Sequence, residues 1–364
     1  MSLRITGMGL AVPEHAMAQS DAAALLVSLL HEGGRARTVK ALYARSGIRK
    51  RHSVLLRTGE GPGERRQDFY APARDAQDGG PTTAARMRAF EAAAPPLMAE
   101  AADGALGDAG LSAGEITHLV TVSCTGFFAP GLDAALIQRL GLSRTVERTH
   151  VGFMGCHGAL NGLRVASSLA GADPRARVLL CSVELCSLHL AYGWDPQALV
   201  ANALFSDGAA AVVGVGAARD APGAGWRVAA SGTLLFPDSQ DAMSWRIGDH
   251  GFRMTLSPTV PDLIRAHIGE WLRGWLRRQG LAPEDVRTWA VHPGGPRILT
   301  AFGQAMGLER GVFATSREVL ADFGNMSSAT LLFILHRLRE AGAETPLVAL
   351  AFGPGLVAEV ALLV

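Results

Sequence analysis

The stretch GCHGALNGLRVASSLA, residues 155–170, begins with a cysteine between glycines and continues as an apolar helix. Its apolar side chains recur at the spacing of one helix face: Ala159, Leu163, Ala166 and Leu169. A second stretch, GNMSSATLLFILHRL at residues 324–338, also places a glycine and a small polar residue before an apolar helix. The sequence therefore predicts two related helices, each with a chemically active side chain at its N-terminus.

These two helices belong to a longer internal repeat. Each is preceded by a helix end, an acidic turn and a β-branched strand, in GLSAGEITHLVTVSCTG from Gly110 and GLAPEDVRTWAVHPGG from Gly280. Each is followed by a glycine-led strand, DGAAAVVGVG at 207–216 and GPGLVAEVALLV at 353–364. Strands that alternate with helices favour mixed or parallel sheets covered by helices. We expect a duplicated α/β fold with halves at residues 1–225 and 226–364.

The composition excludes several classes of protein. With 364 residues and 48% hydrophobic content, the chain has ample material for a core. A net charge of +1 gives no sign of a nucleic-acid surface or a polybasic membrane patch. The four cysteines do not have the spacing of a disulfide framework, and no apolar run reaches the roughly 18 residues of a membrane span. We expect a cytoplasmic protein that binds neither nucleic acid nor membrane.

Residues 53–81 form the longest polar segment. They read SVLLRTGEGPGERRQDFYAPARDAQDGGP and are rich in charge and glycine. This composition is typical of a surface loop. We expect no chemistry from it.

Three residues of the repeat suggest a catalytic site. Cys156 and Asn325 occupy equivalent positions at helix N-termini, and His292 ends a strand of the second copy. A helix N-terminus lowers the pKa of a thiol and can hold an oxyanion. Taken singly, these residues could be a core cysteine, a core histidine and an N-cap asparagine. Their matching positions beside glycines favour one shared site.

A metal site is the main rival use of the cysteines and histidines. Cys181, Cys186 and His189 are close in sequence, but LLCSVELCSLHL has the pattern of a strand. An odd separation would put the two thiols on opposite faces of that strand. We therefore expect no metal, and we interpret His157 as a local hydrogen-bonding residue.

Five ordered motifs resemble one known family. VGFMGCHGA, ALFSDGAAAVV, WAVHPGGPRIL, FGNMSSATLLFIL and AFGPGL are similar to those of the type III polyketide synthases, the group of chalcone synthase and its bacterial relatives. The resemblance runs from about Tyr43 to the C-terminus. It implies a thiolase fold, a duplicated αβαβα sandwich, in a cytoplasmic homodimer.

The resemblance also implies roles for individual residues. Cys156 would carry the acyl starter, and His292 with Asn325 would drive malonyl decarboxylation and stabilise the enolate. Iterative condensation with malonyl-CoA and ring closure would then give a pyrone or a phenolic ring. Acyl-CoA and malonyl-CoA are the implied substrates, and no metal or other cofactor is required. Arg45, Arg49, Lys50 and Arg51 lie where the family has its basic tunnel mouth, although a solvated basic turn explains them equally well.

The pocket residues depart from the plant pattern. Phe205 matches the aromatic gatekeeper, and AFGPGL at 351–356 matches a loop that supports the cavity wall. The other pocket positions implied by the resemblance are Cys124, Cys186, His189, Trp245, Met254 and Ser327. Several replace plant residues of different size, and Trp245 stands where the plant enzyme has glycine. We therefore expect a reshaped cavity and, as in many bacterial relatives, aliphatic starters that give alkylpyrones or alkylresorcinols.

Three rival functions stay open at this stage. A β-ketoacyl-ACP synthase III shares the Cys, His and Asn set, but its C-terminal loop is closer to GFGGG than to FGPGL. An acyl-CoA thioesterase would have no use for the asparagine motif. A catalytically inactive binding protein would not need all three of Cys156, His292 and Asn325.

Overall fold

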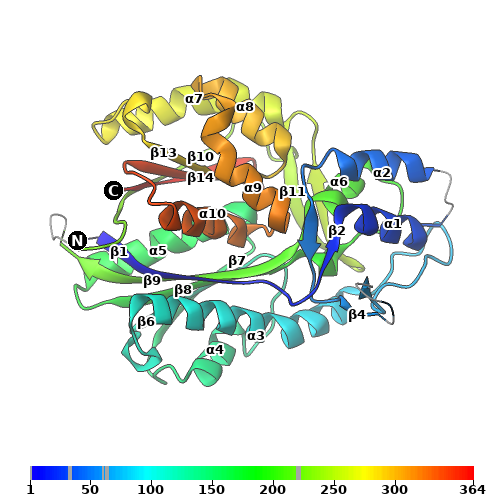
Figure 1. Ribbon diagram of the computed structural model, residues 1–364, viewed down its shortest axis with the longest axis horizontal. Coiled ribbons are helices and arrows are strands. Elements are labelled where there is room, and N and C mark those ends of the chain that lie inside the picture. Colours follow the sequence, from blue (N-terminus) through cyan, green and yellow to red (C-terminus); the bar gives the residue numbers. More distant parts are fainter. Residues whose placement is uncertain (1, 32–34, 60, 62–64, 219–222) are drawn as a thin grey trace.

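The computed structural model describes residues 2–31, 35–59, 61, 65–218 and 223–364. Two β-sheets alternate with three layers of helices, which makes the αβαβα sandwich of the thiolase fold (Figure 1). The first sheet has the order β1-β9-β8-β6-β7, formed by Ser2–Ala11, Asp207–Ala217, Arg177–Leu185, His118–Ser123 and Glu147–Gly152. The second has the order β10-β15-β14-β13, formed by Val228–Leu235, Val357–Leu363, Leu347–Gly353 and Thr288–Val291.

The two sheets share one pattern of pairing. In the first, β6 runs parallel to β8, whereas β8 to β9 and β9 to β1 are antiparallel. In the second, β13 runs parallel to β14, whereas β14 to β15 and β15 to β10 are antiparallel. The mixed sheets expected from the repeat are therefore present. The chain passes from one sheet to the other between β9 and β10.

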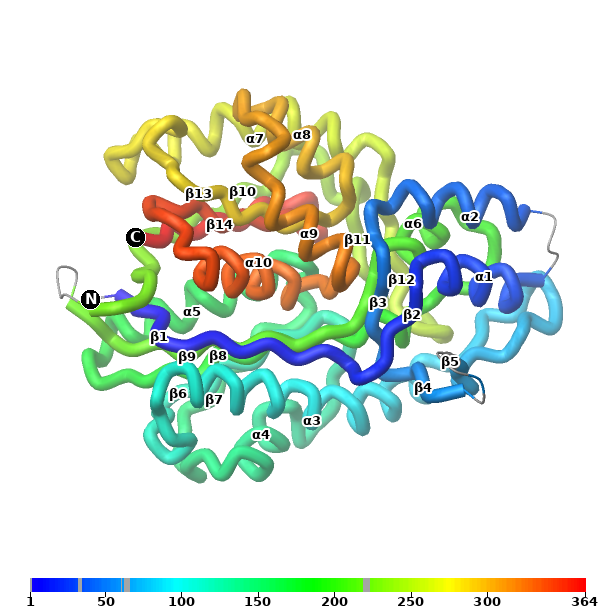
Figure 2. Tube along the Cα trace, viewed as in Figure 1, coloured from blue at the N-terminus to red at the C-terminus, as the bar shows by residue number. Residues whose placement is uncertain are grey.

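The central layer consists of the two helices that opened the sequence analysis, α5 (Gly158–Ala172) and α10 (Ser328–Glu340). Both lie between the sheets, and their apolar faces share one core with strands above and below (Figure 2). Leu163 and Leu335 are fully buried there. Burial on all sides explains why α10 has an apolar sequence with few polar positions in its first turns.

The outer layers cover the opposite faces of the sheets. Helices α3 (Thr83–Ala109) and α4 (Leu132–Leu140) pack on the first sheet, and α7 (Val260–Arg278) and α8 (Pro296–Met306) pack on the second. Successive strand residues point to opposite layers: Leu119 belongs to the α3 side and Val120 to the central layer. The inner strands β6, β8 and β14 are buried on both faces, which explains their largely apolar sequences.

Smaller elements gather at one end of the sandwich, at the right of Figure 1. They are α1 (Gln19–Leu29), α2 (Ala36–Ala44), α6 (Pro196–Leu204), the hairpin of β11 (Met243–Gly248) and β12 (Gly251–Leu256), and the short strands β2 (Ala16–Ala18), β3 (Lys50–His52), β4 (Arg57–Thr58) and β5 (Arg65–Arg66). Of these elements, α1, α6, β2, β3 and the β11–β12 hairpin contribute residues to the lining of the main cavity. Helix α9 (Ala314–Phe323) lies between α8 and α10 in sequence. Within the described ranges, no helix has both the length and the apolarity that crossing a bilayer requires.

Candidate active site

Cys156 lies on a short 3-10 turn, η3 (Gly155–His157), between strand β7 and helix α5. The residue before it, Gly155, has a φ of +76°. A Cβ at that position would lie 2.4 Å from Cδ of Pro354, in the turn between β14 and β15. Only glycine lets the two segments approach this closely. The glycine before the cysteine therefore lets the turn that carries Cys156 pack against the FGPGL loop.

The backbone of Asn325 ties the second half to the segment that carries Phe205. Its N–H donates to the Leu204 carbonyl at 2.9 Å, and its carbonyl accepts from the Ser206 N–H at 2.9 Å. Its side-chain Oδ1 accepts from the backbone N–H of Ser327 at 2.9 Å. That bond orients the amide, and its Nδ2 has no hydrogen-bond partner in the described part of the chain.

His292 follows the last residue of β13, as expected from the sequence. Its backbone N–H donates to the Leu350 carbonyl at 2.8 Å, which continues the pairing with β14. The side chain is buried, and among the described residues neither ring nitrogen has a hydrogen-bond partner. Burial, with a smaller contribution from the charge of His157, lowers the pKa of His292 to about 3. The imidazole is therefore neutral when the surrounding groups are uncharged.

The thiol of Cys156 has a pKa opposite to the one expected from its place before a helix. Burial raises the pKa of Cys156 to about 12, although the Ser327 hydroxyl and the Asn325 amide oppose this rise. The Ser327 hydroxyl lies 3.6 Å from Sγ of Cys156 and 3.2 Å from Sγ of Cys124. The free-energy cost of burying a thiolate exceeds the stabilisation that the helix N-terminus gives to that thiolate. A proton moved from Cys156 to His292 would keep the buried pair neutral overall.

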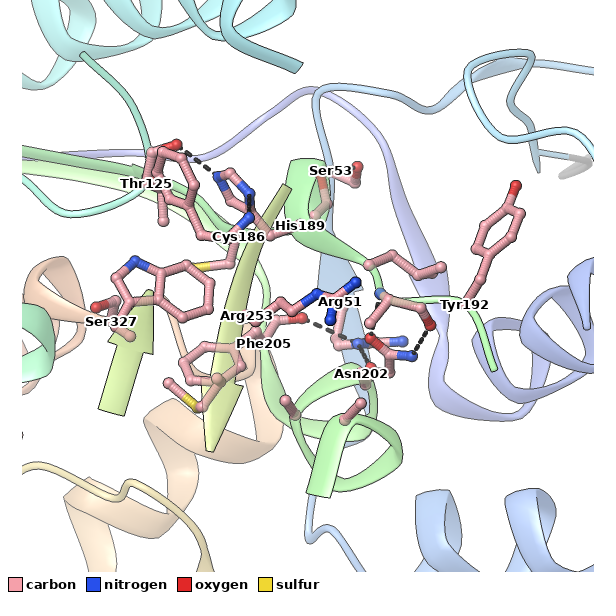
Figure 3. A pocket seen from close by; sticks show the side chains of 18 of the residues that line it. Arg51, Ser53, Thr125, Cys186, His189, Tyr192, Asn202, Phe205, Arg253 and Ser327 are labelled. Carbon is pink, nitrogen blue, oxygen red and sulfur yellow. Dashed lines mark hydrogen bonds between the residues drawn. The ribbon is translucent and has the colours of Figure 1, made fainter. Parts of the chain in front are cut away.

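A cavity of about 500 Å³ leads to Cys156. All the pocket residues implied by the resemblance line it: Cys124, Cys186, His189, Phe205, Trp245, Met254 and Ser327. Figure 3 shows Cys186, His189, Phe205 and Ser327 around this space. His292 and Asn325 do not belong to the described lining, whereas Cys156 and Ser327 do. The cavity therefore reaches the thiol directly.

Trp245 and His189 build one wall of the cavity. Trp245 lies opposite Met254 in the β11–β12 hairpin, and its indole N–H donates to the Cys124 carbonyl at 2.7 Å. The His189 ring stacks on Phe252 with centroids 4.2 Å apart. Its Nε2 donates to the Thr125 carbonyl at 2.7 Å (Figure 3), and its Nδ1 accepts from the Phe252 N–H at 3.0 Å.

Both ring nitrogens of His189 are thus engaged. Burial lowers its pKa to about 3. The residue holds the hairpin in place as a neutral side chain, and it is poorly suited to act as a base.

Glu184 is a buried residue whose contribution the sequence analysis missed. Its carboxylate accepts from the Cys124 N–H at 3.0 Å and from the Thr125 hydroxyl at 2.7 Å, and it also bonds the Ser328 hydroxyl. It therefore connects strand β8 to the Cys124 segment and to the start of α10. A glutamate within an otherwise apolar strand was the available signal, because a fully buried carboxylate requires several donors.

Two expectations from the sequence were wrong. The segment 53–81 contributes to the cavity, because Leu55, Leu56, Gln67, Tyr70 and Gly79 line it; residues 60 and 62–64 of the segment lie outside the described residues.

The strand containing Cys181 ends at Leu185, and Cys186 begins the 3-10 turn η4 (Cys186–His189). The change of element lets Cys186 face the cavity while Cys181 stays in the core.

The basic segment does not act as a single cluster. Arg51 lines the cavity, and its guanidinium donates to the carbonyls of Asn202 at 2.6 Å and Phe205 at 2.9 Å (Figure 3). Arg49 pairs with Asp322 on α9. Arg45 and Lys50 are exposed. A role in binding CoA stays a prediction for all four.

The two repeated halves of the fold bring a cysteine, a histidine and an asparagine near one cavity. This arrangement is that of an acyl-transferring enzyme of the thiolase fold. Residues 3–219 match the family model described as "Chalcone and stilbene synthases, N-terminal domain", and residues 227–364 match the corresponding C-terminal domain. The chain belongs to the chalcone and stilbene synthase family. It is a type III polyketide synthase and therefore an acyltransferase.

Three similar proteins align with almost the whole chain. It is 42% identical to a 1,3,6,8-tetrahydroxynaphthalene synthase of Streptomyces peucetius subsp. caesius, across 97% of this chain and 90% of that protein. It is 32% identical to the alpha-pyrone synthesis polyketide synthase-like Pks18 of Mycobacterium tuberculosis, across 98% of this chain and 89% of that protein. The crystal structure of PKS-I from the brown alga Ectocarpus siliculosus superimposes with a TM-score of 0.92 at 31% identity, covering 100% of this chain and 98% of that one.

Proposed function

We propose that the enzyme loads an acyl-CoA starter on Cys156, extends it with malonyl-CoA and closes the product into a ring. One observation carries this proposal. Among the described residues, the ring nitrogens of His292 and Nδ2 of Asn325 are buried without a hydrogen-bond partner, and both side chains lie near the turn that carries Cys156. Leaving such atoms unpaired costs about 1 to 3 kcal/mol each, so a site that retains them has a polar ligand to receive. The oxygen of a malonyl-derived enolate is a suitable ligand.

The proposed steps use only groups already present. The Cys156 thiol transfers its proton to neutral His292, and the sulfur attacks the starter thioester while CoA leaves as the thiol after taking up a proton. Malonyl-CoA then loses CO₂, and the electron pair of the broken C–C bond becomes the enolate. Donors from His292 and Asn325 hold its oxygen. The enolate carbon attacks the Cys156 thioester, which releases the thiolate and lengthens the chain by two carbons.

The cavity supports ring closure to a pyrone or a phenolic ring. Its volume of about 500 Å³ and its lining of Phe205, Trp245, Phe252 and Met254 suit an apolar acyl chain. We propose aliphatic starters and alkylpyrone or alkylresorcinol products. The relative at 42% identity favours a second candidate, a polyhydroxylated naphthalene, because that is the product in its name.

The test is a product assay with the purified enzyme. It is incubated with malonyl-CoA alone and with acyl-CoA starters from acetyl to palmitoyl plus coumaroyl, and products are identified by mass spectrometry. Cyclised polyketides are expected, and they should disappear in Cys156→Ala. Cys181→Ala is the matched control, because that thiol is buried in the core away from the cavity.

The outcomes separate the candidate functions. A naphthalene product from malonyl-CoA alone would select the second candidate. A single two-carbon extension that requires acyl carrier protein would establish a β-ketoacyl synthase instead. Free acid as the only product would establish a thioesterase.

We also infer that the enzyme works as a homodimer in the cytoplasm. Strand β7 is at the edge of its sheet and most of its residues are exposed. Next to it are the exposed side chains of Phe127 (52%), Phe153 (36%) and Met154 (38%). An open strand edge beside apolar side chains is suited to pairing with a second copy. The free state of all four cysteines fits a reducing compartment.

A further inference from the structure

Arg51, on strand β3, lies at the junction between the segment that carries Phe205 and the segment that carries Asn325. Its guanidinium donates to the carbonyls of Asn202 at 2.6 Å and Phe205 at 2.9 Å, at the C-terminal end of α6 (Figure 3). Its aliphatic stem packs against the other segment, because a Cβ at Gly324 would lie 3.2 Å from Cγ of Arg51. One side chain therefore contacts both segments.

The carbonyls that Arg51 binds are of the kind that the end of a helix leaves without partners. The sequence of α6, PQALVANAL, contains no basic residue, so Arg51 supplies from β3 the positive charge that a helix C-terminus favours. Tyr43 of α2 strengthens the contact. Its hydroxyl donates to the Asn202 carbonyl at 3.0 Å, and its ring centroid lies 5.2 Å from Cζ of Arg51. Two buried contacts therefore hold the end of α6 in place.

The end of α6 is joined to Asn325 through the backbone. Phe205 and Asn325 form a parallel β-bridge, and the two backbone hydrogen bonds at Asn325, from its N–H to Leu204 and from Ser206 to its carbonyl, are both 2.9 Å long. Because the bridge is this short, a shift of Phe205 would be passed to Asn325. The residue proposed to guard the cavity and the residue proposed to hold the enolate are thus mechanically linked.

Direct contact with substrate is the rival role for Arg51. Its side chain lines the main cavity, and its Nε is buried without a hydrogen-bond partner in the described part of the chain. In the rival role, loss of Arg51 would weaken the binding of the CoA thioester. A positioning role predicts slower chemistry after the substrate has bound. Kinetics can therefore separate the two roles.

We propose that Arg51 is a positioning residue that holds Phe205 in the cavity wall and, through the bridge, keeps the Asn325 amide in place. The proposal rests on the function proposed above. Loss of the guanidinium should change the choice of starter, through Phe205, and slow the capture of the enolate, through Asn325. A residue that only stabilised the fold would leave the choice of starter unchanged.

The first test follows the enolate. kcat and KM for CO₂ release are measured with malonyl-CoA and with malonyl-pantetheine, which lacks the nucleotide. Arg51→Met removes the guanidinium but keeps the stem, and kcat should fall about tenfold or more with both substrates, because a misplaced group slows its step. Arg51→Lys keeps a cation and should recover part of the rate. A rise in KM confined to malonyl-CoA, with kcat unchanged, would assign Arg51 to CoA binding and overturn the proposal.

The matched control is Arg273→Met. Arg273 also donates to a backbone carbonyl, that of Ala305 at 3.0 Å, but it is outside the described lining of the main cavity. Its loss should leave both kcat values unchanged. An equal fall in kcat for Arg273→Met and Arg51→Met would show a general effect of losing such a contact, and would overturn the special role of Arg51.

The second test follows the starter. Hexanoyl-CoA and palmitoyl-CoA compete for the enzyme in the presence of malonyl-CoA, and mass spectrometry gives the ratio of their products. In Arg51→Met this ratio should shift about threefold or more, because Phe205 is no longer held in the wall. An unchanged ratio would contradict the proposal.

Crystal structures of the variants give a readout that does not depend on activity. In Arg51→Met, the Phe205 ring and the Asn325 amide should both be displaced from their wild-type positions, and finding both in place would overturn the proposal. Arg51→Lys supplies the comparison if Arg51→Met does not fold. If the wild type forms no polyketide, the proposed function fails, whereas these structures still decide whether Arg51 positions the two residues.

Discussion

Burial decides the charge state of the residues proposed to react. It raises the pKa of the Cys156 thiol to about 12 and lowers that of the His292 imidazole to about 3, so each resists a charge on its own. The same burial lets a thiolate and an imidazolium stabilise each other if they form together. Asn325, held by Ser327, offers a donor that stays neutral at every pH of interest. In the proposed mechanism, proton transfer and oxyanion binding are therefore carried out by different residues.

Asn325→Leu tests this division of roles. Loss of one oxyanion donor should slow malonyl-CoA decarboxylation about 100- to 1000-fold. Acylation of Cys156 by the starter should continue, because it does not require the enolate site. Radiolabelled CO₂ release measures the first reaction and intact-protein mass spectrometry the second. Equal loss of both would show that Asn325 acts on the thiol instead.

Trp245→Gly tests the wall of the cavity. Removing the indole opens space opposite Met254 and deletes the bond to the Cys124 carbonyl. We expect acceptance of longer starters and longer products in the mass-spectrometric assay. Trp245→Phe keeps most of the volume but loses the N–H donor, and it should keep the original range of starters. An unchanged range in Trp245→Gly would mean that this side chain does not limit the substrate.

At the scale of elements, the turn Gly155–His157, which carries Cys156, depends on its packing against the turn between β14 and β15. Gly155 contacts Pro354, and a Cβ at Gly353 would lie 2.4 Å from the His157 ring. The His157 ring is held in turn by Asn161 at 2.7 Å, as the sequence analysis expected of a local hydrogen bond. Residues of the second half of the fold thus pack directly against the turn that carries Cys156 in the first half.

Gly155→Ala should therefore disturb both folding and activity. The new methyl group would clash with Pro354 on a backbone with φ of +76°, at a cost of about 2 to 5 kcal/mol in the free energy of unfolding. The control is Gly141→Ala: Gly141 has a φ of +69°, a Cβ there would meet no atom of the described residues within 4 Å, and the change should cost about 1 kcal/mol. Urea unfolding gives both values. Similar losses in the two variants would mean that the contact with Pro354 is unimportant.

At the scale of the whole molecule, one buried carboxyl makes stability depend on pH. Asp207, at the start of β9, accepts from the N–H groups of Val54 and Ser187 and from the Ser187 hydroxyl. Burial nevertheless raises its pKa to about 6. Since the folded pKa lies above the unfolded value of 3.8, the folded state binds the proton more tightly. This contribution is complete below about pH 4 and is lost as the pH rises through 6.

Asp207→Asn should remove that dependence. Between pH 4 and pH 6.5 the wild type should lose about 2 kcal/mol of unfolding free energy relative to the variant, whatever the absolute stability of each. Urea unfolding at several pH values measures the difference. Parallel curves for the two proteins would show that Asp207 has an ordinary pKa in the folded state.

Assembly is the other property of the whole molecule. Phe153→Asp places a charge in the exposed apolar group beside β7 and should shift the protein from dimer to monomer in light scattering after gel filtration. Val312 is an exposed apolar residue of the 3-10 turn Arg310–Phe313. Val312→Asp is the control and should leave the dimer intact. A monomeric wild type, or a Phe153→Asp dimer of unchanged stability, would contradict the proposed interface.

Much of the fold could be predicted because its signals are local. The apolar spacing of α5 and α10, the β-branched strands and the repeat between the two halves follow from side chains a few residues apart. The positions of Cys156 and His292 at element ends were also visible, whereas Asn325 lies two residues before Ser327, the N-cap of α10, and not at the helix N-terminus expected from the sequence. The contribution of residues 53–81 to the cavity was not visible, because a polar loop has no periodic pattern that shows what it covers.

By itself, the sequence determined the secondary structure, the duplicated architecture and the residue types offered to the site, since these depend on short-range periodicity and on motif order. Only the tertiary structure decided the charge state of Cys156 and His292, the fixed tautomer of His189 and the set of donors around Glu184. The physical reason is that desolvation and hydrogen bonding are set by neighbours far apart in the chain, such as Glu184 and Ser328, and no local pattern encodes those contacts.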